Sequence, residues 1–494
     1  MSEKYETVIG LEVHSQLLTR SKMFCSCGSD YQNSPPNTRV CAVCMGMPGI
    51  LPVVNVKAVE IAIRTGLALG CTIARKTKFD RKNYPYPDLM KGYQISQYDQ
   101  PVAESGVLAI GTKSGANKNI RITRVHLEED VAKLVHTSDS KNKPYSMVDI
   151  NRAGVPLMEI VSEPDMRSPE EAHNYLTLLH NIVRYIGAST ANMEEGSFRC
   201  DANISVRMKG DQRLGKKVEI KNLNSFRSVL RALKYEEIRQ IKCLEFNKDI
   251  HQETRGWIEA TGKTRSQRTK EQASDYRYFP EPDIPPLHVS SQWIDSIRQN
   301  LPELPEIKKQ RFMTRFTLGQ YDATLLTSNK ENSDLFEGVQ DVLNKSNGED
   351  NSFKAKLTAN WINVELARLV NEKDSNVESS GISAQNLSQL IDLIHDDKLT
   401  SSAAKTVFEI MFAKGGNPTH ISKDMDLVQV SDTEFIADTV SKVIDENPPA
   451  VEDYINGKDS ALKFMVGQVM KKTKGKANPK LAQKRLKETL QNMT

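Results

Sequence analysis

Long apolar stretches are missing from this sequence. No run approaches the roughly 20 residues that a membrane-spanning helix requires. The first residues, 1–6, carry charges of both signs and are typical of neither a signal peptide nor a transit peptide. We therefore expect a cytoplasmic protein without a membrane-spanning segment.

A large excess of one charge is also missing. The net charge is only +4 over 494 residues, so any basic surface must come from local clustering rather than from overall composition. One such cluster stands near the C-terminus, with no acidic residue among its members. They are Lys471, Lys472, Lys474, Lys476, Lys480, Lys484, Arg485 and Lys487. The residues alone leave two interpretations open, contact with nucleic acid and an ordinary solvated surface.

The sequence has few cysteines, and their odd number, seven, argues against a disulfide framework in a reducing compartment. Four of them fall within twenty residues, as Cys25-x-Cys27 and Cys41-x-x-Cys44. Two thiolate pairs separated by thirteen residues suit a tetrahedral structural zinc ion, although the first pair is one residue shorter than the commoner spacing. The alternative is a set of buried or incidental thiols.

A phosphate-binding loop is lacking as well. The segment Gly256–Thr264 (GWIEATGKT) comes close, but it places five residues rather than four before its Gly-Lys pair, and no apolar strand precedes it. We interpret it as a polar hairpin or turn. If the protein uses ATP, metal ions and side chains must hold the phosphates.

The length predicts more than one domain, because single cores rarely exceed about 300 residues. Strand patterns prevail up to about residue 290 and helical patterns follow, with a proline-rich seam at Tyr278–Pro286. We predict a first domain at residues 1–293, a helical domain at 294–408 and a helical tail domain at 409–494.

The first domain has an α+β pattern. Apolar and polar residues alternate around Ile9–Gln16, Phe198–Val206 and Val218–Lys221, which predicts strands of an antiparallel sheet with one polar face. Between them, Ser168 is a predicted N-cap, with Glu171 completing a capping box, and Gly187 stops the helix.

Carboxylates are frequent in this domain. Glu12 and His14 share a strand face, Glu128 and Glu129 are adjacent, and Glu159 interrupts an apolar run. A buried carboxylate is costly unless a cation or hydrogen-bond donors compensate it, and Mg²⁺ prefers such oxygen ligands. Solvated or salt-bridged carboxylates are the alternative. Our further candidates for phosphate or nucleotide contacts, all from the polar strand faces, are Arg199, Asp201, Asn203 and Lys221.

Further motifs are spread over nearly the whole chain. They are Ile9–His14, Lys78–Tyr84, Tyr93–Gln97, Val125–Asp130, Asn151–Asp165, Met193–Ser205, Lys221–Phe226, Asp275–Asp283 and Phe464–Lys480. Together, and in this order, these segments resemble the B subunits of the tRNA-dependent amidotransferases.

The resemblance implies a fold and an activity. The fold would be a cradle related to glutamine synthetase and guanido kinases, followed by a helical domain and a YqeY-like tail that grips tRNA. The protein would phosphorylate with ATP the side-chain carboxylate of Glu-tRNA(Gln) or Asp-tRNA(Asn). It would work in a heterotrimer, beside an amidase (glutaminase) that supplies ammonia and a small third protein that clamps the two together.

The resemblance also implies roles for single residues. His14, Glu129 and Glu159 would be Mg²⁺ ligands, with Glu12 and Glu128 beside them. Lys82 resembles a residue at the mouth of the family's ammonia channel, and the cysteines would hold structural zinc.

Two other classes of function remain to be tested. One is a tRNA-binding scaffold whose catalysis resides in a partner, against which the carboxylates in apolar surroundings argue. The other is a stand-alone acid-ammonia ligase, which leaves the basic tail unexplained.

Overall fold

The computed structural model describes residues 4–112, 117–139, 142–269, 276–347, 352–377, 379–427, 433–455, 457–473, 477 and 479–491. The chain forms two compact units, Met1–Leu304 and Pro305–Thr494, which are treated separately below. Of the helices in the described ranges, none combines the length and apolarity needed to cross a membrane.

The first unit is built on a large sheet. Within the described residues the sheet has nine strands in the order β14-β13-β12-β11-β1-β10-β7-β6-β2, and every neighbouring pair is antiparallel except the parallel pair β12 and β13. The strands are β1 (Tyr5–Gln16), β2 (Thr72–Ile73), β6 (Ala103–Gly111), β7 (Asn117–Glu129), β10 (Pro156–Ser162), β11 (Phe198–Met208), β12 (Val218–Lys221), β13 (Glu253–Ile258) and β14 (Lys263–Thr269). The mixed α/β character expected from the sequence is confirmed.

Strand β1 explains why the sheet has two unlike faces. Ile9, Leu11 and Val13 are almost completely buried, while Glu12 and His14 between them are partly exposed. Successive side chains of a strand point to opposite faces, so one face of β1 enters the core and the other forms a polar surface.

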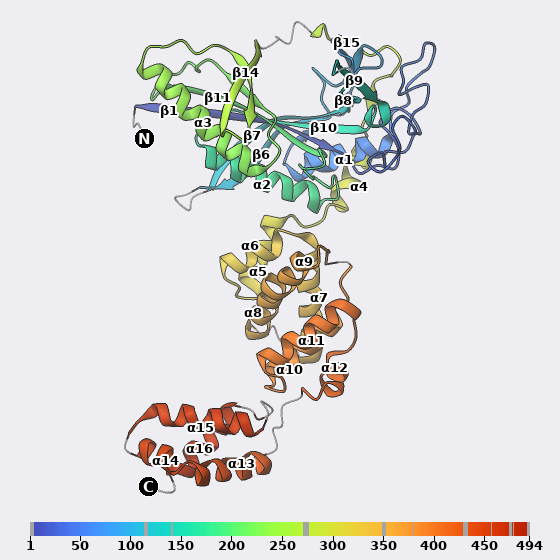
Figure 1. Ribbon diagram of the computed structural model, residues 1–494. Coiled ribbons are helices and arrows are strands. Elements are labelled where there is room, and N and C mark those ends of the chain that lie inside the picture. Colours follow the sequence, from blue (N-terminus) through green and yellow to red (C-terminus); the bar gives the residue numbers. More distant parts are fainter. Residues whose placement is uncertain are drawn as a thin grey trace. The chain divides into compact units, whose positions relative to one another are not determined.

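Helices cover the apolar face. They are α1 (Val56–Ala68), α2 (Pro169–Tyr185) and α3 (Phe226–Glu245), and α1 and α2 lie along the same side of the sheet in Figure 1. Ser168 caps α2 as predicted, because its Oγ accepts a hydrogen bond from the N–H of Glu171 at 3.2 Å. The Glu171 carboxylate, however, accepts from the N–H of Arg167 and not from that of Ser168, so the capping box is incomplete.

The first unit also contains three small sheets in its described residues, β15-β4-β5, β16-β3 and β8-β9. Their strands are β3 (Lys76–Thr77), β4 (Asp80–Asn83), β5 (Tyr93–Ser96), β8 (Lys133–Ser138), β9 (Pro144–Asp149), β15 (Phe279–Pro280) and β16 (Leu287–His288), with a 3₁₀ turn at Ile150–Arg152. The proline-rich segment belongs to this unit: β15 pairs with β4, and Glu281 accepts two hydrogen bonds from Arg81.

The second unit is helical in its described residues. Its elements are α5 (Pro305–Arg315), α6 (Gln320–Thr327), α7 (Lys330–Asn347), α8 (Ser352–Asn360), a π-helical segment (Trp361–Leu366), α9 (Ala367–Glu372), α10 (Ala384–His395), α11 (Ser401–Lys414), α12 (Pro418–Asp424), α13 (Thr433–Glu446), α14 (Pro448–Ile455), α15 (Asp459–Lys472) and α16 (Pro479–Gln491). One apolar cluster joins residues 312–412, and another joins residues 436–490.

The two predicted domain boundaries fall inside helices. Helix α4 (Ser291–Gln299) continues across 293/294 and buries Ile294 and Ile297 in the core of the first unit. Helix α11 continues across 408/409, and Met411 and Phe412 still belong to the 312–412 cluster.

Candidate functional site

Three predicted residues meet on the polar face of the sheet. His14 on β1 lies opposite Glu159 on β10, and its Nε2 is 3.4 Å from Glu159 Oε2. The same nitrogen is 3.7 Å from Glu128 Oε1 on β7. One ligand atom from each residue lies within 4.8 Å of the others, so the group could hold a metal ion.

A fourth member, His126, was not predicted from the sequence. Its Nε2 lies 3.1 Å from Glu159 Oε2, and its ring is nearly fully buried. Burial alone would raise the pKa of Glu159, but the imidazoles of His126 and His14 hold it well below its ordinary value. Conversely, burial would lower the pKa of His14, yet Glu159 and Glu128 raise it to about 9. Both shifts have one cause, because the carboxylates and the His14 imidazole stabilise each other's charged forms; a bound cation would take the place of the proton on His14.

Glu129 points away from this group. Its Oε1 lies 2.5 Å from Lys91 Nζ and accepts a hydrogen bond from the N–H of Ile95 at 3.0 Å. Glu128 and Glu129 are neighbours on β7, so their side chains leave opposite faces. Of the predicted magnesium set, the structure thus brings together His14 and Glu159, with Glu128 at the position expected for Glu129.

The other candidates on the polar face form pairs beside this group. Asn203 donates to Glu12 at 2.8 Å, and Lys221 Nζ lies 3.2 Å from Asp201 Oδ2. Burial would lower the pKa of Lys221, but Asp201 and Glu219 raise it, so this lysine is a cation.

Arg199 is bound to the buried carboxylate of Asp130. Gln16 and Arg152 complete the surroundings of Asp130, at 2.7 Å and 3.7 Å. Arg199 lines a cavity near His14 nonetheless, so it can present one edge of its guanidinium there.

Lys82 stands in a ring of tyrosines. Its Nζ lies 5.7 Å from the ring centre of Tyr84 and 5.1 Å from that of Tyr276, which are cation–π distances. Tyr278 stacks on Tyr98 at 4.2 Å. Burial would lower the pKa of Lys82, but Glu128 and, more weakly, Glu159 raise it, so the lysine carries a positive charge beside the carboxylates.

Three cavities adjoin at these residues. A cavity of about 290 Å³ contains Glu12, His14 and Glu159. A second, of about 390 Å³, is lined by Glu128 and Arg199, and a third, of about 780 Å³, by the tyrosines. Lys82 and Lys221 line all three. The arrangement offers carboxylates and imidazoles for a cation and lysines for anionic groups in one hollow.

The near-match to a phosphate-binding loop is a hairpin. Strands β13 and β14 pair antiparallel around it, from Ile258 opposite Lys263 onward. The interpretation as a hairpin is confirmed.

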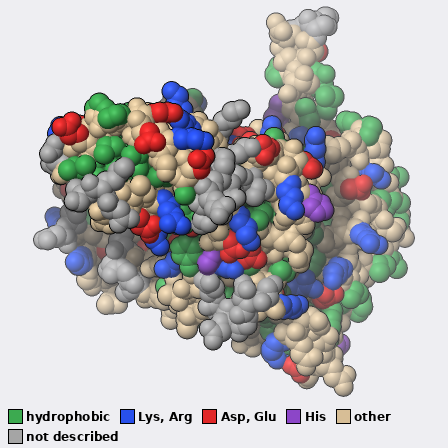
Figure 2. Space-filling model, turned by 90° about the horizontal axis from the view of Figure 1, so that it is seen from below, with side chains coloured by type: hydrophobic (Ala, Val, Ile, Leu, Met, Phe, Trp, Pro, Cys, Tyr) green, Lys and Arg blue, Asp and Glu red, His purple; other side chains and the backbone are tan. Residues whose placement is uncertain are grey.

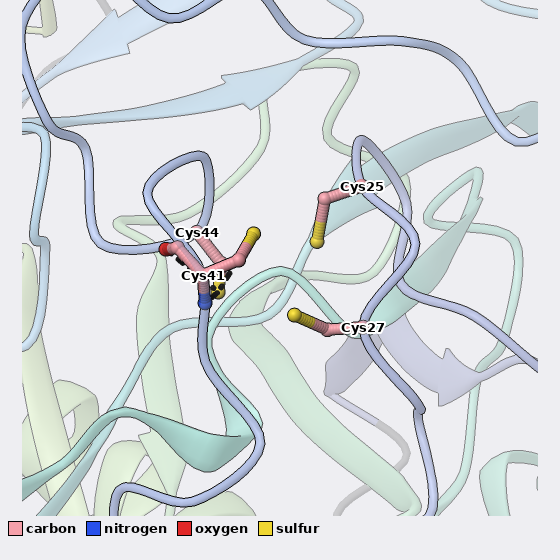
Figure 3. A group of neighbouring side chains, drawn as sticks. All are labelled: Cys25, Cys27, Cys41 and Cys44. Carbon is pink, nitrogen blue, oxygen red and sulfur yellow. Dashed lines mark hydrogen bonds between the residues drawn. The ribbon is translucent and has the colours of Figure 1, made fainter.

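The four clustered cysteines form a second candidate site. Cys25 and Cys27 come from one loop and Cys41 and Cys44 from another, and Figure 3 shows the two pairs facing each other. Their sulfur atoms lie within 4.8 Å of one another, and the N–H of Cys41 donates to Cys44 Sγ at 3.2 Å. Four thiols at this spacing could hold a zinc ion.

A buried lysine accompanies the cysteines. Lys22 is fully buried, and its Nζ donates to the backbone oxygen of Arg39 at 2.8 Å. The pKa of Cys44 is lowered, first by a hydrogen bond from Cys25 and also by the charge of Lys22. This lysine offsets part of the negative charge that four thiolates would carry.

The basic residues of the tail are partly neutralised. Lys472 pairs with Glu446, and Arg485 lies 3.2 Å from Glu488. Lys474 and Lys476 lie outside the described residues. In Figure 2, Lys and Arg side chains of the described parts are interspersed with Asp and Glu.

Comparison with known proteins defines the class. Residues 7–295 match the family model of the GatB/GatE catalytic domain, and residues 341–490 match that of the GatB domain. The first match covers more than half of the chain, so the chain belongs to the GatB/GatE class of proteins.

Relatives over the full length narrow this further. The chain is 53% identical over 491 residues to the B subunit of the aspartyl/glutamyl-tRNA(Asn/Gln) amidotransferase of Dehalococcoides mccartyi strain 195, covering 99% of both chains. It is 51% identical over 487 residues to that of Caldanaerobacter subterraneus subsp. tengcongensis, again with 99% of each covered. The chain belongs to the family formed by the B subunits of the aspartyl/glutamyl-tRNA(Asn/Gln) amidotransferases.

Proposed function

We propose that this chain phosphorylates the side-chain carboxylate of Glu-tRNA(Gln), Asp-tRNA(Asn) or both with ATP, and that ammonia then displaces the phosphate. Family membership supports the tRNA amidation role. The observation that carries the phosphoryl-transfer step is the convergence of His14, Glu128 and Glu159 beside Lys82 and Lys221.

We propose that His14, Glu128 and Glu159 would hold Mg²⁺, with Glu128 taking the place first assigned to Glu129. Two carboxylates and one imidazole fit this cation, because the oxygen-rich set leaves room for phosphate and water. When bound, Mg²⁺ would neutralise charge on the phosphate oxygens. Glu12, held by Asn203, stands next to the set in the same cavity.

Lys82 and Lys221 would contact the substrate carboxylate and the phosphate groups of ATP. A carboxylate oxygen of the aminoacyl group attacks the γ-phosphorus, ADP leaves, and an acyl phosphate forms. Lys82 and Lys221 line the hollow where these negative charges meet, and as cations they would position and stabilise them. Ammonia attacks the acyl carbon, and phosphate leaves as the amide forms. Lys82, surrounded by tyrosine rings, is our candidate for the position at which ammonia enters.

The remaining assignments concern partners and the second metal. We propose that an amidase (glutaminase) partner supplies the ammonia, that a small third protein joins the two in a heterotrimer, and that the basic tail contacts tRNA. The cysteine cluster would hold zinc for stability only, because its loops contribute no residue to the carboxylate group.

One experiment separates this function from its alternatives. ATP cleavage is measured with the chain and its copurifying partners, with and without mischarged tRNA. Stimulation by mischarged tRNA supports the proposal. If the chain were a scaffold with catalysis in a partner, Glu159→Gln in this chain would leave the tRNA-stimulated cleavage unchanged. A stand-alone ligase would cleave ATP with free glutamate and ammonia.

A further inference from the structure

The largest of the three cavities, which we call the tyrosine vestibule, shares Lys82 and Lys221 with the site, but the steps above give its other lining residues no binding role. It measures about 780 Å³ and is lined by Asn83, Tyr84, Tyr86, Gln267 and Tyr276 among others. Lys82 and Lys221 line this cavity and also that of His14 and Glu159. Anything bound in the vestibule therefore adjoins the carboxylate group.

The substrate's own covalent structure places a nucleoside close to the reaction. In an aminoacyl-tRNA the amino acid is esterified to the ribose of the terminal adenosine. When the side-chain carboxylate lies beside His14 and Glu159, that adenosine must lie within one aspartyl or glutamyl length. The tyrosine vestibule adjoins the carboxylate group at this short range.

A second cavity also adjoins the carboxylate group, because Glu12 lines both. It measures about 380 Å³ and is lined by Val8, Gly10, Val161 and Leu214 among others, with no aromatic side chain. This cavity therefore offers no ring on which a base can stack, whereas the tyrosine vestibule does.

The vestibule has the chemistry that holds an unpaired base. Single-stranded RNA ends are bound by stacking on aromatic rings and by hydrogen bonds to base edges. Tyr86 is 54% exposed, and among the described residues its ring stacks on no other aromatic ring. Gln267 supplies an amide of the kind that pairs with adenine, whereas the amide nitrogen of Asn83 donates to the backbone oxygens of Arg81 and Arg277.

We propose that the tyrosine vestibule binds the 3′-terminal adenosine of the aminoacyl-tRNA, with its base stacked on Tyr86. This inference rests on the proposed function and assigns the acceptor end of the substrate to a particular cavity.

A small stable probe tests the inference without the tRNA body. The probe is 3′-amino-3′-deoxyadenosine acylated with glutamate on its 3′-nitrogen. Glutamate methylamide is its counterpart without a nucleoside. Binding of both to the full-length chain with its copurifying partners is measured by calorimetry. We expect the probe to bind at least about tenfold more tightly than the methylamide, and Tyr86→Leu to remove this preference.

Two further variants serve as controls. Tyr86→Phe keeps the flat ring and should keep the preference. Tyr321→Leu removes a tyrosine that is 75% exposed on α6, far along the chain from the vestibule, and should change nothing.

The possible results separate cleanly. A preference that survives Tyr86→Leu overturns the inference, and so does a Tyr86→Leu variant that weakens ATP binding instead, because the vestibule would then hold the base of ATP. A third result is normal probe binding without stimulation of ATP cleavage by mischarged tRNA. It would count against the proposed function and leave the cavity assignment standing.

Discussion

At the scale of single residues, strand alternation decides which carboxylate reaches the site. Val125 and Leu127 on β7 are fully buried, so Arg124, His126 and Glu128 share the opposite face. The same pattern is readable in the sequence, and it could have found His126 and favoured Glu128. It was missed because Glu128 and Glu129 look equivalent until the buried side of the strand is known.

Glu159→Gln tests the metal set directly. It keeps the side-chain shape and removes the charge that attracts a cation, so tRNA-dependent ATP cleavage should fall by at least about a hundredfold, roughly 2.7 kcal/mol. Thermal unfolding is recorded alongside. If the carboxylate were merely a structural partner of His126, activity would fall only in proportion to folded protein.

Glu128→Gln and Glu129→Gln form a matched pair on adjacent positions. We expect Glu128→Gln to abolish Mg²⁺-dependent ATP cleavage as Glu159→Gln does. Glu129→Gln should act mainly on stability, because it weakens the contact with Lys91. Measuring the Mg²⁺ concentration for half-maximal activity distinguishes them, and the reverse ranking would restore Glu129 to the metal set.

Cys41→Ser tests the second metal. We expect one zinc ion per chain in protein purified without chelator, and loss of that zinc in the variant, with a lower unfolding temperature and a spared catalytic rate per folded molecule. Elemental analysis and thermal unfolding provide the measurements. Zinc-free wild-type protein of normal stability would contradict the assignment.

At the scale of elements, the sequence pattern predicted those strands and turns that depend on neighbouring residues only. The alternation over Phe198–Val206 became β11, and the hairpin around Gly256–Thr264 followed from its turn residues. The parallel pairing of β12 with β13 was not predicted, because it joins segments separated by the whole of α3. Pairing over such distances depends on the folded core rather than on local sequence.

Helix α2 offers a test at this scale. Replacing Ser168 with Ala removes the acceptor for the N–H of Glu171 and should cost about 1 kcal/mol. In a unit of this size the unfolding temperature should drop by about 2–4 °C. Ser168→Asp retains a capping oxygen and should remain close to wild type; equal losses in both variants would show that the cap contributes nothing.

At the scale of the whole molecule, the last strand of the described residues ends at His288, close to the predicted change from strands to helices near residue 290, and the predicted domain boundaries lie within helices. Proline at Tyr278–Pro286 predicted a boundary, yet Glu281 and β15 tie this segment to β4. Proline excludes regular structure in its own segment, whereas a domain ends where long-range contacts end. The predicted cut at residue 409 likewise passes through α11.

A truncation designed from the structure therefore ends at residue 427, which keeps α11 and α12 and removes α13 to α16. We expect weaker tRNA binding and a shallower dependence of affinity on salt, because fewer counterions are released when the basic tail is absent. ATP cleavage should persist at high tRNA concentration. Filter binding over a range of salt concentrations measures the slope, and an unchanged slope would mean that the tail lysines are ordinary solvated surface.

Strand β1 lies at the centre of the sheet between β10 and β11, and it alternates core residues with site residues. For directed evolution this means that a substitution in β1 made to raise the unfolding temperature is expected to change the catalytic rate as well. A library at Ile9, Leu11 or Val13 would shift the neighbouring Glu12 and His14 as the backbone adjusts. Stabilising substitutions are better sought in the helical unit, because none of the candidate catalytic residues lies in its helices.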